Sequence, residues 1–251
     1  MKLGRRSITF ILVITIVSTW GCTRDDSGVR ANQEGEAGRT PAEKETSAAK
    51  RVVDFRPGIR IDYRVPQVEI ESGVILREAE LELFAYAKAP VPKEHETILL
   101  LRVKPEHIYQ ALGLIGLEPG HPVSYDLETQ TITEASGDAV DVRVRYEKDS
   151  ETVEHSASDW MYDLERDAPM QQTHWIFAGS KRDEKGRFAA DVEGTVVTVV
   201  NFDTALLCLP DLHTDSDRSL WLRARTEVIP PVGTKVTLIL RPAQGPTSQK
   251  E

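Results

Sequence analysis

The clearest alternation of hydrophobic and polar residues covers residues 139–147. Its hydrophobic side chains fall on one face of an extended chain: Val140, Val142, Val144 and Tyr146. A period of two is typical of a strand in an antiparallel sheet with one face in the core. Residues 80–83 and 235–240 alternate in the same way, so several such strands are predicted.

A run of mostly β-branched residues without alternation covers residues 196–200. Such a run is typical of a central strand that is covered on both faces. Residues 136–138 and 184–186 combine glycine with polar neighbours, which is the chemistry of turns between adjacent strands.

One helix is clearly predicted, over residues 105–115. Pro105 suits the first helical position, and Gly116 can adopt the left-handed conformation that ends a helix. Hydrophobic residues recur between them at helical spacing: Ile108, Ala111, Leu112 and Ile115. A second, short helix is possible over residues 204–209, with the Asp203 carboxylate as its cap.

Long alternation of strands and helices is absent, which disfavours a doubly wound sheet. The pattern therefore predicts an α+β fold that is mainly antiparallel β. No linker-like stretch divides residues 52–242, and their length is within the usual range of a single domain. Residues 243–251 are polar and are predicted to form a flexible tail.

Residues 1–21 have the pattern of a lipoprotein-type signal peptide. Basic residues precede an apolar run over residues 8–17, which is shorter than a membrane-spanning helix needs. Cys22 follows a small residue, an arrangement that resembles the lipobox of bacterial lipoproteins and implies lipidation of Cys22. The alternative is an uncleaved N-terminal anchor. Both interpretations place an exported, membrane-anchored chain in the cell envelope, on the periplasmic side or at the outer membrane.

Residues 22–51 are polar and have hardly any aliphatic side chains. Such a stretch cannot bury enough apolar surface to offset its ordering entropy, so it is predicted to be a disordered tether.

The whole chain has a net charge of −9. This charge argues against nucleic acid as a partner, because nucleic-acid binding needs a basic footprint.

The chain has only two cysteines, too few for an iron–sulfur cluster, so no cofactor of that kind is expected. Cys208 lies in an apolar run and is predicted to be buried and unreactive. The sequence contains neither a nucleophile elbow nor a phosphate-binding glycine loop. No catalytic residue is therefore assigned.

Four residues are candidate metal or ligand groups: His95, Glu96, Asp159 and His174. A metalloprotease helix would need a second histidine where Leu99 stands. The four residues can form a metal site only if the fold brings them together, and scattered surface positions are the favoured interpretation. The acidic stretch 211–217 lacks the ligand spacing of a calcium-binding loop and is interpreted as solvated.

Three tryptophans are candidate platforms for stacking a sugar ring: Trp160, Trp175 and Trp221. Aromatic residues make up only 6% of the chain, so packing in the core is the favoured alternative for these rings.

Several segments between Val65 and Pro242 resemble the YdjY domain, a family of bacterial exported proteins with planctomycete lipoprotein members. The segments are Lys93-Glu94-His95-Glu96, Lys104-Pro105, Ala111-Leu112, Leu117-Glu118-Pro119-Gly120, Asp159-Trp160, Trp175-Ile176-Phe177-Ala178-Gly179-Ser180, Asn201-Phe202 and Pro230-Pro231-Val232-Gly233-Thr234. Members have been described as ferredoxin-like, which would imply a cluster-dependent redox role, but this chain lacks the cysteines for it. The resemblance implies one exported domain and no particular activity.

The preferred hypothesis is therefore a non-enzymatic, lipid-anchored envelope protein that binds an unknown partner protein or small ligand. One alternative is a metal-binding protein or metal-dependent enzyme that uses His95, Glu96, Asp159 and His174. The other is a carbohydrate- or peptidoglycan-binding module that stacks sugars on its tryptophans.

Overall fold

The computed structural model describes residues 51–126, 128–212 and 220–243. All of these residues belong to one compact unit, Thr40–Glu251. The predicted signal peptide with Cys22, almost all of the predicted tether and tail, and most of the acidic stretch 211–217 lie outside the described residues. No helix in the described ranges is long and apolar enough to cross a membrane.

The described elements follow one another along the chain as short strands with a few helices. They are β1 (Val52–Arg56), β2 (Ile59–Asp62), β3 (Gln67–Val74), β4 (Leu83–Ala87), the 3-10 helix η1 (Glu94–Glu96), β5 (Thr97–Leu101), α2 (Pro105–Leu114), β6 (Pro119–His121), β7 (Ser124–Asp126), β8 (Thr131–Thr133), β9 (Ser136–Gly137), β10 (Ala139–Lys148), β11 (Glu151–Ser156), the 3-10 helix η2 (Ala157–Trp160), β12 (Met161–Asp163), β13 (Ala168–Pro169), β14 (Trp175–Ile176), α3 (Ala189–Glu193), β15 (Thr195–Thr198), β16 (Leu222–Ala224) and β17 (Lys235–Pro242).

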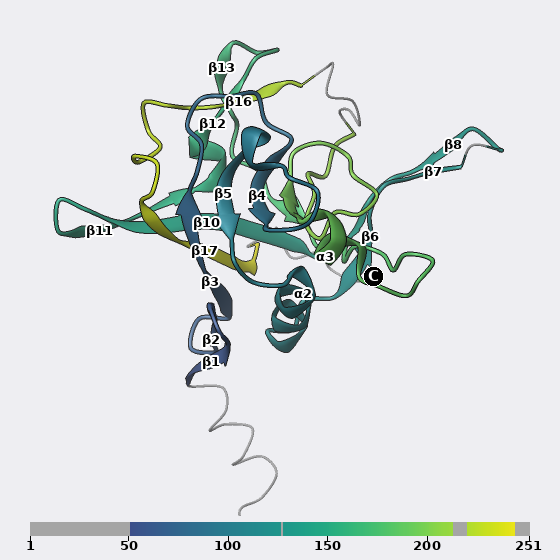
Figure 1. The fold of residues 1–251 in the computed structure, drawn as a ribbon, viewed down its shortest axis with the longest axis horizontal. Coiled ribbons are helices and arrows are strands. Elements are labelled where there is room, and N and C mark those ends of the chain that lie inside the picture. The colour runs from purple at the N-terminus through teal and green to yellow at the C-terminus, as the bar shows by residue number, and fades with distance from the viewer. Residues whose placement is uncertain (1–50, 127, 213–219, 244–251) are drawn as a thin grey trace, which may run out of the picture. The chain divides into compact units, whose positions relative to one another are not determined.

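A ten-stranded sheet forms the body of the domain (Figure 1). Its main path runs β11-β10-β17-β3-β5-β4-β15, while β2 also pairs with β3, β1 with β2, and β14 with β10. Every pair in it is antiparallel except β4 with β5, which are parallel. The prediction of a mainly antiparallel α+β fold is confirmed.

Strand β10 shows the predicted alternation directly. Its hydrophobic residues Val140, Val142 and Val144 are fully buried, while the charged residues between them are half-exposed. Val142 lies opposite Leu240 of β17, so the buried faces of the two strands join in one core. At β10, one face of the sheet is therefore apolar and the other face carries charges.

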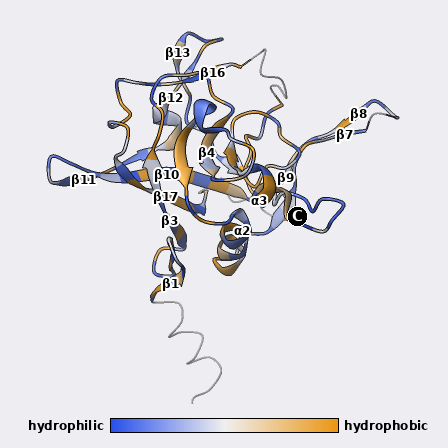
Figure 2. Cartoon of the chain, in the orientation of Figure 1, coloured by the Kyte–Doolittle hydropathy of each residue, from blue (hydrophilic) through white to orange (hydrophobic). Residues whose placement is uncertain are grey.

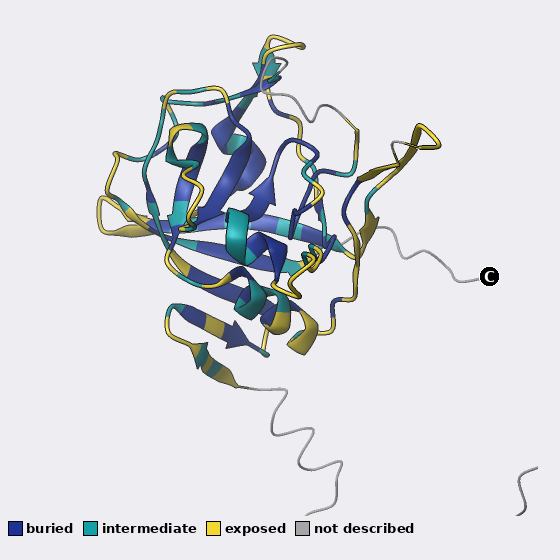
Figure 3. Ribbon diagram, turned by 45° about the vertical axis from the view of Figure 1, so that its right-hand side comes forward, coloured by how far each residue is buried: buried dark blue, intermediate teal, exposed yellow. Residues whose placement is uncertain are grey.

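Strands β4, β5 and β15 lie at one end of the path of the sheet and are buried almost completely. The ribbon near the β4 label is largely orange in Figure 2, which marks hydrophobic residues, and the interior of the domain is dark blue in Figure 3, which marks buried residues. The predicted strand at 80–83 begins three residues later, as β4, with only a bridge at Glu80. The predicted strand at 196–200 is β15, and its burial is confirmed. It is the last strand of the path rather than a central one, and residues 206–207 cover its outer side.

Helix α2 occupies the predicted residues. Its first turn is completed by a neighbour, because the backbone N–H of Glu106 donates to Asp191 Oδ1 of α3 at 2.9 Å. Its buried face consists of Pro105, Ile108, Ala111 and Leu112. Gly116 has φ +92°, which is the predicted left-handed conformation, and the N–H of Leu117 then bonds to the Leu112 carbonyl.

The predicted short helix at 204–209 is wrong, because residues 203–204 form a turn and residues 207–208 form β-bridges with neighbouring segments. The N–H groups of Leu206 and Leu207 donate to the Thr195 and Val196 carbonyls, and the Ile176 N–H donates to the Cys208 carbonyl. Asp203 pairs with Lys181 instead of capping a helix. A short apolar run has no hydrophobic periodicity by which a helix could be told from a strand. Here, backbone hydrogen bonds with β14 and β15 determine its conformation.

The predicted turn at 136–138 is also wrong. Ser136 and Gly137 form strand β9, and the turn of this region lies beyond β7, where Asp126 accepts the N–H groups of Glu128 and Thr129. Gly137 has φ +133°, and a Cβ atom there would lie 2.1 Å from the Phe177 carbonyl oxygen. This glycine therefore permits close contact between two backbones rather than a turn.

Candidate functional site

The four candidate metal ligands do not form a common site. His95 is on the surface with its side chain 75% exposed, and its Nε2 lies 3.5 Å from Glu96 Oε2. Asp159 completes a capping box at η2 by accepting the N–H of Ser156, and it also accepts the Gln172 amide at 2.7 Å. Within the described ranges, no three His, Cys, Asp or Glu side chains are grouped to hold a metal ion.

The three candidate stacking tryptophans are in the core. Trp160 and Trp175 are fully buried, and Trp221 is 7% exposed. The Trp175 and Trp221 indoles donate to the carbonyls of Thr198 and Val199. Stacking a sugar needs an exposed ring face, and none of these three rings presents one.

Cys208 is buried, as predicted, with 1% of its surface exposed. Burial raises the pKa of its thiol to about 12. The thiolate that would react is therefore absent near neutral pH.

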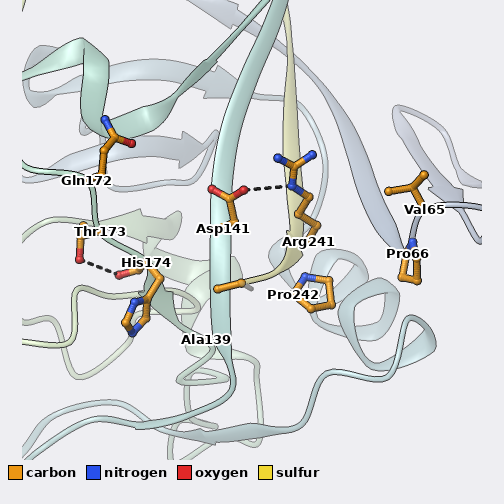
Figure 4. A pocket seen from close by; sticks show the side chains of 10 residues that line it. Val65, Pro66, Ala139, Asp141, Gln172, Thr173, His174, Arg241 and Pro242 are labelled. Carbon is orange, nitrogen blue, oxygen red and sulfur yellow. Dashed lines mark hydrogen bonds and ion pairs between the residues drawn. The ribbon is translucent and has the colours of Figure 1, made fainter. Parts of the chain in front are cut away.

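His174 lines an open surface cavity, which we call the His174 pocket. Its volume is about 830 Å³, and it is lined by Val65, Pro66, Ala139, Asp141, Gln172, Thr173, His174, Arg241, Pro242 and Ala243. Figure 4 shows Asp141 and Arg241 side by side on β10 and β17, with Gln172, Thr173 and His174 on one side and Val65 and Pro66 on the other. Four separate segments therefore contribute to one open pocket.

Strand register explains the charged floor of this pocket. Asp141 lies directly opposite Arg241 in the pairing of β10 with β17, and Arg241 Nε donates to Asp141 Oδ2 at 3.0 Å. The same strand face continues with an ion pair of Arg143 with Glu154. No hydrogen bond or ion pair engages the His174 ring within the described part of the chain. The pocket thus contains the Asp141–Arg241 ion pair, in which the two charges cancel. It also contains the His174 imidazole, which has no partner in the described part of the chain, and the apolar residues Val65, Pro66 and Pro242.

Further along this charged face, Glu69 is held by arginines. Arg145 Nη2 donates to Glu69 Oε1 at 2.7 Å, Gln67 donates to the same oxygen, and Arg60 pairs with the other oxygen. Burial by itself raises the pKa of Glu69, but Arg145 and Arg60 together hold it below its usual value. This carboxylate stays ionised and fastens β2, β3 and β10 to one another.

A second group of charges, which we call the Lys93 cluster, lies at the other end of the sheet. Lys93 Nζ is 2.7 Å from Glu82 Oε2 and 3.0 Å from Glu96 Oε1, and it lies 4.6 Å from the centre of the Phe202 ring. The three charged side chains are only 11–15% exposed. The fold thus joins two segments of the family pattern, 93–96 and 201–202, that are far apart in the sequence.

Protonation of the Lys93 cluster is shifted from ordinary behaviour. Burial and the neighbouring Glu82 carboxyl raise the pKa of Glu96, although Lys93 opposes this. Burial tends to lower the pKa of Lys93, but Glu82 and Glu96 raise it above the usual value. Glu96 and Lys93 therefore both hold a proton more strongly than such side chains usually do, and Lys93 stays charged.

Sequence reasoning identified His174, His95 and Glu96, but missed their neighbours. Asp141 lies on the polar face of the predicted strand 139–147, and Arg241 directly follows the predicted strand 235–240. Their contact was not predicted, because pairing between residues 100 positions apart cannot be read from alternation. Lys93 and Phe202 were visible within the family pattern, but their contact was not.

Comparison with known proteins gives a family for this fold. The family model of the YdjY domain matches residues 59–241, a range that runs from β2 to β17 and includes the Lys93 cluster and most of the His174 pocket. No curated protein and no solved structure matches the chain. Because the match extends over more than half of the sequence, the chain belongs to the YdjY domain family.

Proposed function

We propose that the chain is an exported, lipid-anchored protein of the cell envelope whose YdjY domain binds a small ligand in the His174 pocket. The observation that carries this proposal is the pocket itself. Its volume of about 830 Å³ is within the range that small-molecule sites occupy, and its lining combines apolar residues with the polar side chains of Asp141, His174 and Arg241.

The chemistry of the pocket indicates the kind of ligand. Asp141 and Arg241 neutralise one another, so the floor favours a polar group that accepts and donates hydrogen bonds rather than a strongly charged one. The unengaged imidazole of His174 supplies a donor and an acceptor, while Val65, Pro66 and Pro242 supply apolar contact. We expect a small molecule with an apolar body and a polar end.

Binding is tested with a library of small amphipathic compounds and amide chemical shifts of the domain. A compound that binds as proposed shifts the amides of residues 139–141 and 172–174 and loses most of its affinity in His174→Ala. The matched control is His95→Ala, because His95 is an exposed histidine outside the pocket. Shift changes scattered over the domain, or equal affinity in both variants, would contradict the proposal.

The anchor rests on the sequence of residues 1–22. A Cys22→Ala variant is expected to lose incorporation of labelled fatty acid and, once its signal peptide is removed, to leave the membrane fraction. Cys208→Ala is the control, since Cys208 is buried in the folded domain. Processed Cys22→Ala protein that remains in the membrane would show that the lipid is not the anchor.

A further inference from the structure

Strand β11 forms an outer edge of the ten-stranded sheet. It is the first strand of the path and pairs only with β10, so its other side faces no described strand. Figure 1 shows the β10–β11 hairpin extending beyond the rest of the domain. The six residues of β11 contain no proline, and their register with β10 is unbroken. An edge of this kind can accept a further strand.

The turn of this hairpin determines which backbone groups face outward. Asp149 and Ser150 connect the two strands, and both have positive φ, at 51° and 66°. This conformation is that of a tight hairpin turn, in which the flanking residues Lys148 and Glu151 exchange backbone hydrogen bonds. Hydrogen-bonded and non-hydrogen-bonded pairs then alternate along the two strands. Every second residue of β11 therefore directs its N–H and C=O groups away from β10.

The outward-directed groups belong to Thr152, Glu154 and Ser156. The Ser156 N–H donates to Asp159 Oδ2 at 3.0 Å, which agrees with this alternation. The backbone groups of Thr152 and Glu154 have no hydrogen-bond partner within the described ranges, and both residues are exposed. The edge therefore offers unpaired donors and acceptors to another strand.

The side chains of β11 are arranged symmetrically about Val153, which lies opposite Tyr146 of β10. Glu151 and His155 lie on the same face as Val153, two residues to either side of it. The Glu151 carboxylate has no ion-pair or hydrogen-bond partner among the described residues. In the same part of the chain the His155 ring only stacks on Tyr146, with ring centres 6.0 Å apart. An acid and an imidazole are thus each available for a polar contact.

An antiparallel pair of β11 strands joins these groups. When the two-fold axis passes through Val153, this residue faces its own copy and Glu151 faces His155 of the second copy. Thr152 lies opposite Glu154 of the second copy, so their outward backbone groups exchange hydrogen bonds. Apolar and oppositely charged side chains that lie directly opposite one another stabilise a pair of strands. The edge is therefore complementary to itself.

The two neighbouring registers that use the same backbone groups fit less well. An axis through Glu154 places two carboxylates directly opposite one another, which is destabilising. An axis through Thr152 places Glu151 opposite Val153 of the second copy and leaves the carboxylate unpaired. The net charge of −9 opposes association at long range, but physiological salt screens charges over about 8 Å, so the contacts within the interface decide the outcome.

We propose that two copies of this chain associate through β11, antiparallel about Val153, so that their two sheets join in one continuous sheet. This inference goes beyond ligand binding and does not depend on it. None of the residues 151–156 lines the His174 pocket, so variants at the strand test the dimer separately from the pocket.

Disulfide cross-linking of the full chain in detergent tests the register. Val153→Cys places the two thiols opposite one another in a non-hydrogen-bonded pair, where a disulfide can form. We expect a cross-linked dimer under mild oxidation. Val232→Cys is the control, because Val232 is 61% exposed and lies outside the strand, and the unchanged chain measures cross-linking through its own cysteines. Cross-linking of Val153→Cys no greater than in these two controls would overturn the proposal.

Sedimentation of the full chain in the same detergent measures the affinity of the dimer. His155→Glu faces Glu151 of the second copy with a like charge and is expected to weaken the dimer about tenfold. Adding Glu151→His reverses the order of the pair and is expected to restore the affinity. His121→Glu is the control, because His121 is exposed and lies outside β11.

The outcomes of the sedimentation experiment separate the possible occupants of the edge. A dimer that is unaffected by His155→Glu, or that the double variant fails to restore, would show that another surface associates. An unchanged chain that sediments as a monomer at micromolar concentrations would overturn the proposal and leave the edge to a strand of a different protein.

Discussion

At the scale of single residues, the most consequential arrangement is Lys93 between two carboxylates. Glu82 precedes β4 and Glu96 precedes β5, so one ammonium group holds together the starts of two parallel strands. These charges are largely removed from water, where an unpaired charge is far more costly than a paired one. The lysine is therefore a structural residue, and the carboxylates depend on it.

Lys93→Met keeps a side chain of similar length and removes its charge. We expect the free energy of unfolding to fall by about 2–4 kcal/mol, because Glu82 and Glu96 are left close together without a counter-ion. Urea unfolding followed by circular dichroism measures the change. Lys88→Met at an exposed position serves as the control and is expected to stay within about 0.5 kcal/mol. Equal losses in the two variants would contradict this role.

The raised pKa of Glu96 leads us to expect that the stability of the fold depends on pH in a specific way. Its pKa is raised in the folded state, so the folded chain holds this proton more tightly than the unfolded chain does. Stability from this group is present below the ordinary pKa of a glutamate and is lost as pH rises through the raised value. Glu96→Gln cannot ionise, and its free energy of unfolding is expected to fall less than that of the unchanged chain between pH 4 and neutrality.

The measurement is urea unfolding at several pH values in the two proteins. Glu94→Gln, at the start of the same 3-10 helix, is the control and should follow the unchanged chain. Parallel curves for Glu96→Gln and the unchanged chain would show that Glu96 does not titrate in this way.

At the scale of elements, helix α2 shows that hydrophobic periodicity identifies which side of a helix is buried. Leu112 is fully buried and Leu114, two residues later, is 51% exposed. We expect Leu112→Ala to lower the free energy of unfolding by about 2–5 kcal/mol through loss of burial and creation of a cavity. Leu114→Ala is the matched control and should change it by less than about 0.5 kcal/mol. Similar losses at both positions would place the helix in another orientation.

Elements whose hydrophobic pattern repeats over many residues could be predicted from the sequence, whereas short elements could not. β10 and α2 each repeat one pattern over about ten residues, so the pattern itself determines which side is buried. Residues 204–209 are too few and too uniformly apolar for that. The Leu206 and Leu207 N–H groups donate to the Thr195 and Val196 carbonyls, and Cys208 pairs with Ile176, and these bonds select a strand-like conformation over a helix. Ser136 and Gly137 were interpreted as a turn because glycine is common in turns. The glycine is required here because the backbone of Phe177 passes too close to leave space for a side chain.

At the scale of the whole molecule, the sheet begins where the polar N-terminal stretch ends. The Tyr63 N–H donates to the Arg51 carbonyl, and β1 starts at the next residue. A chain that begins at Arg51 is therefore expected to unfold at the same urea concentration as the longer chain, since no described contact of the sheet is removed. Circular dichroism over a urea titration measures this. A lower midpoint in the short chain would show that residues before Arg51 stabilise the domain.

The sequence by itself determined the class of fold, the main helix, the strongest strands and the absence of a cluster-binding cysteine set, because these depend on local periodicity and composition. It also identified His174 as a residue of interest, but not the pocket around it. Only the tertiary structure decided that Arg241 meets Asp141, that Lys93 meets Phe202, and that the tryptophans lie in the core. The physical reason is that these contacts join segments far apart in the chain, and strand register sets them rather than the pattern within any one segment.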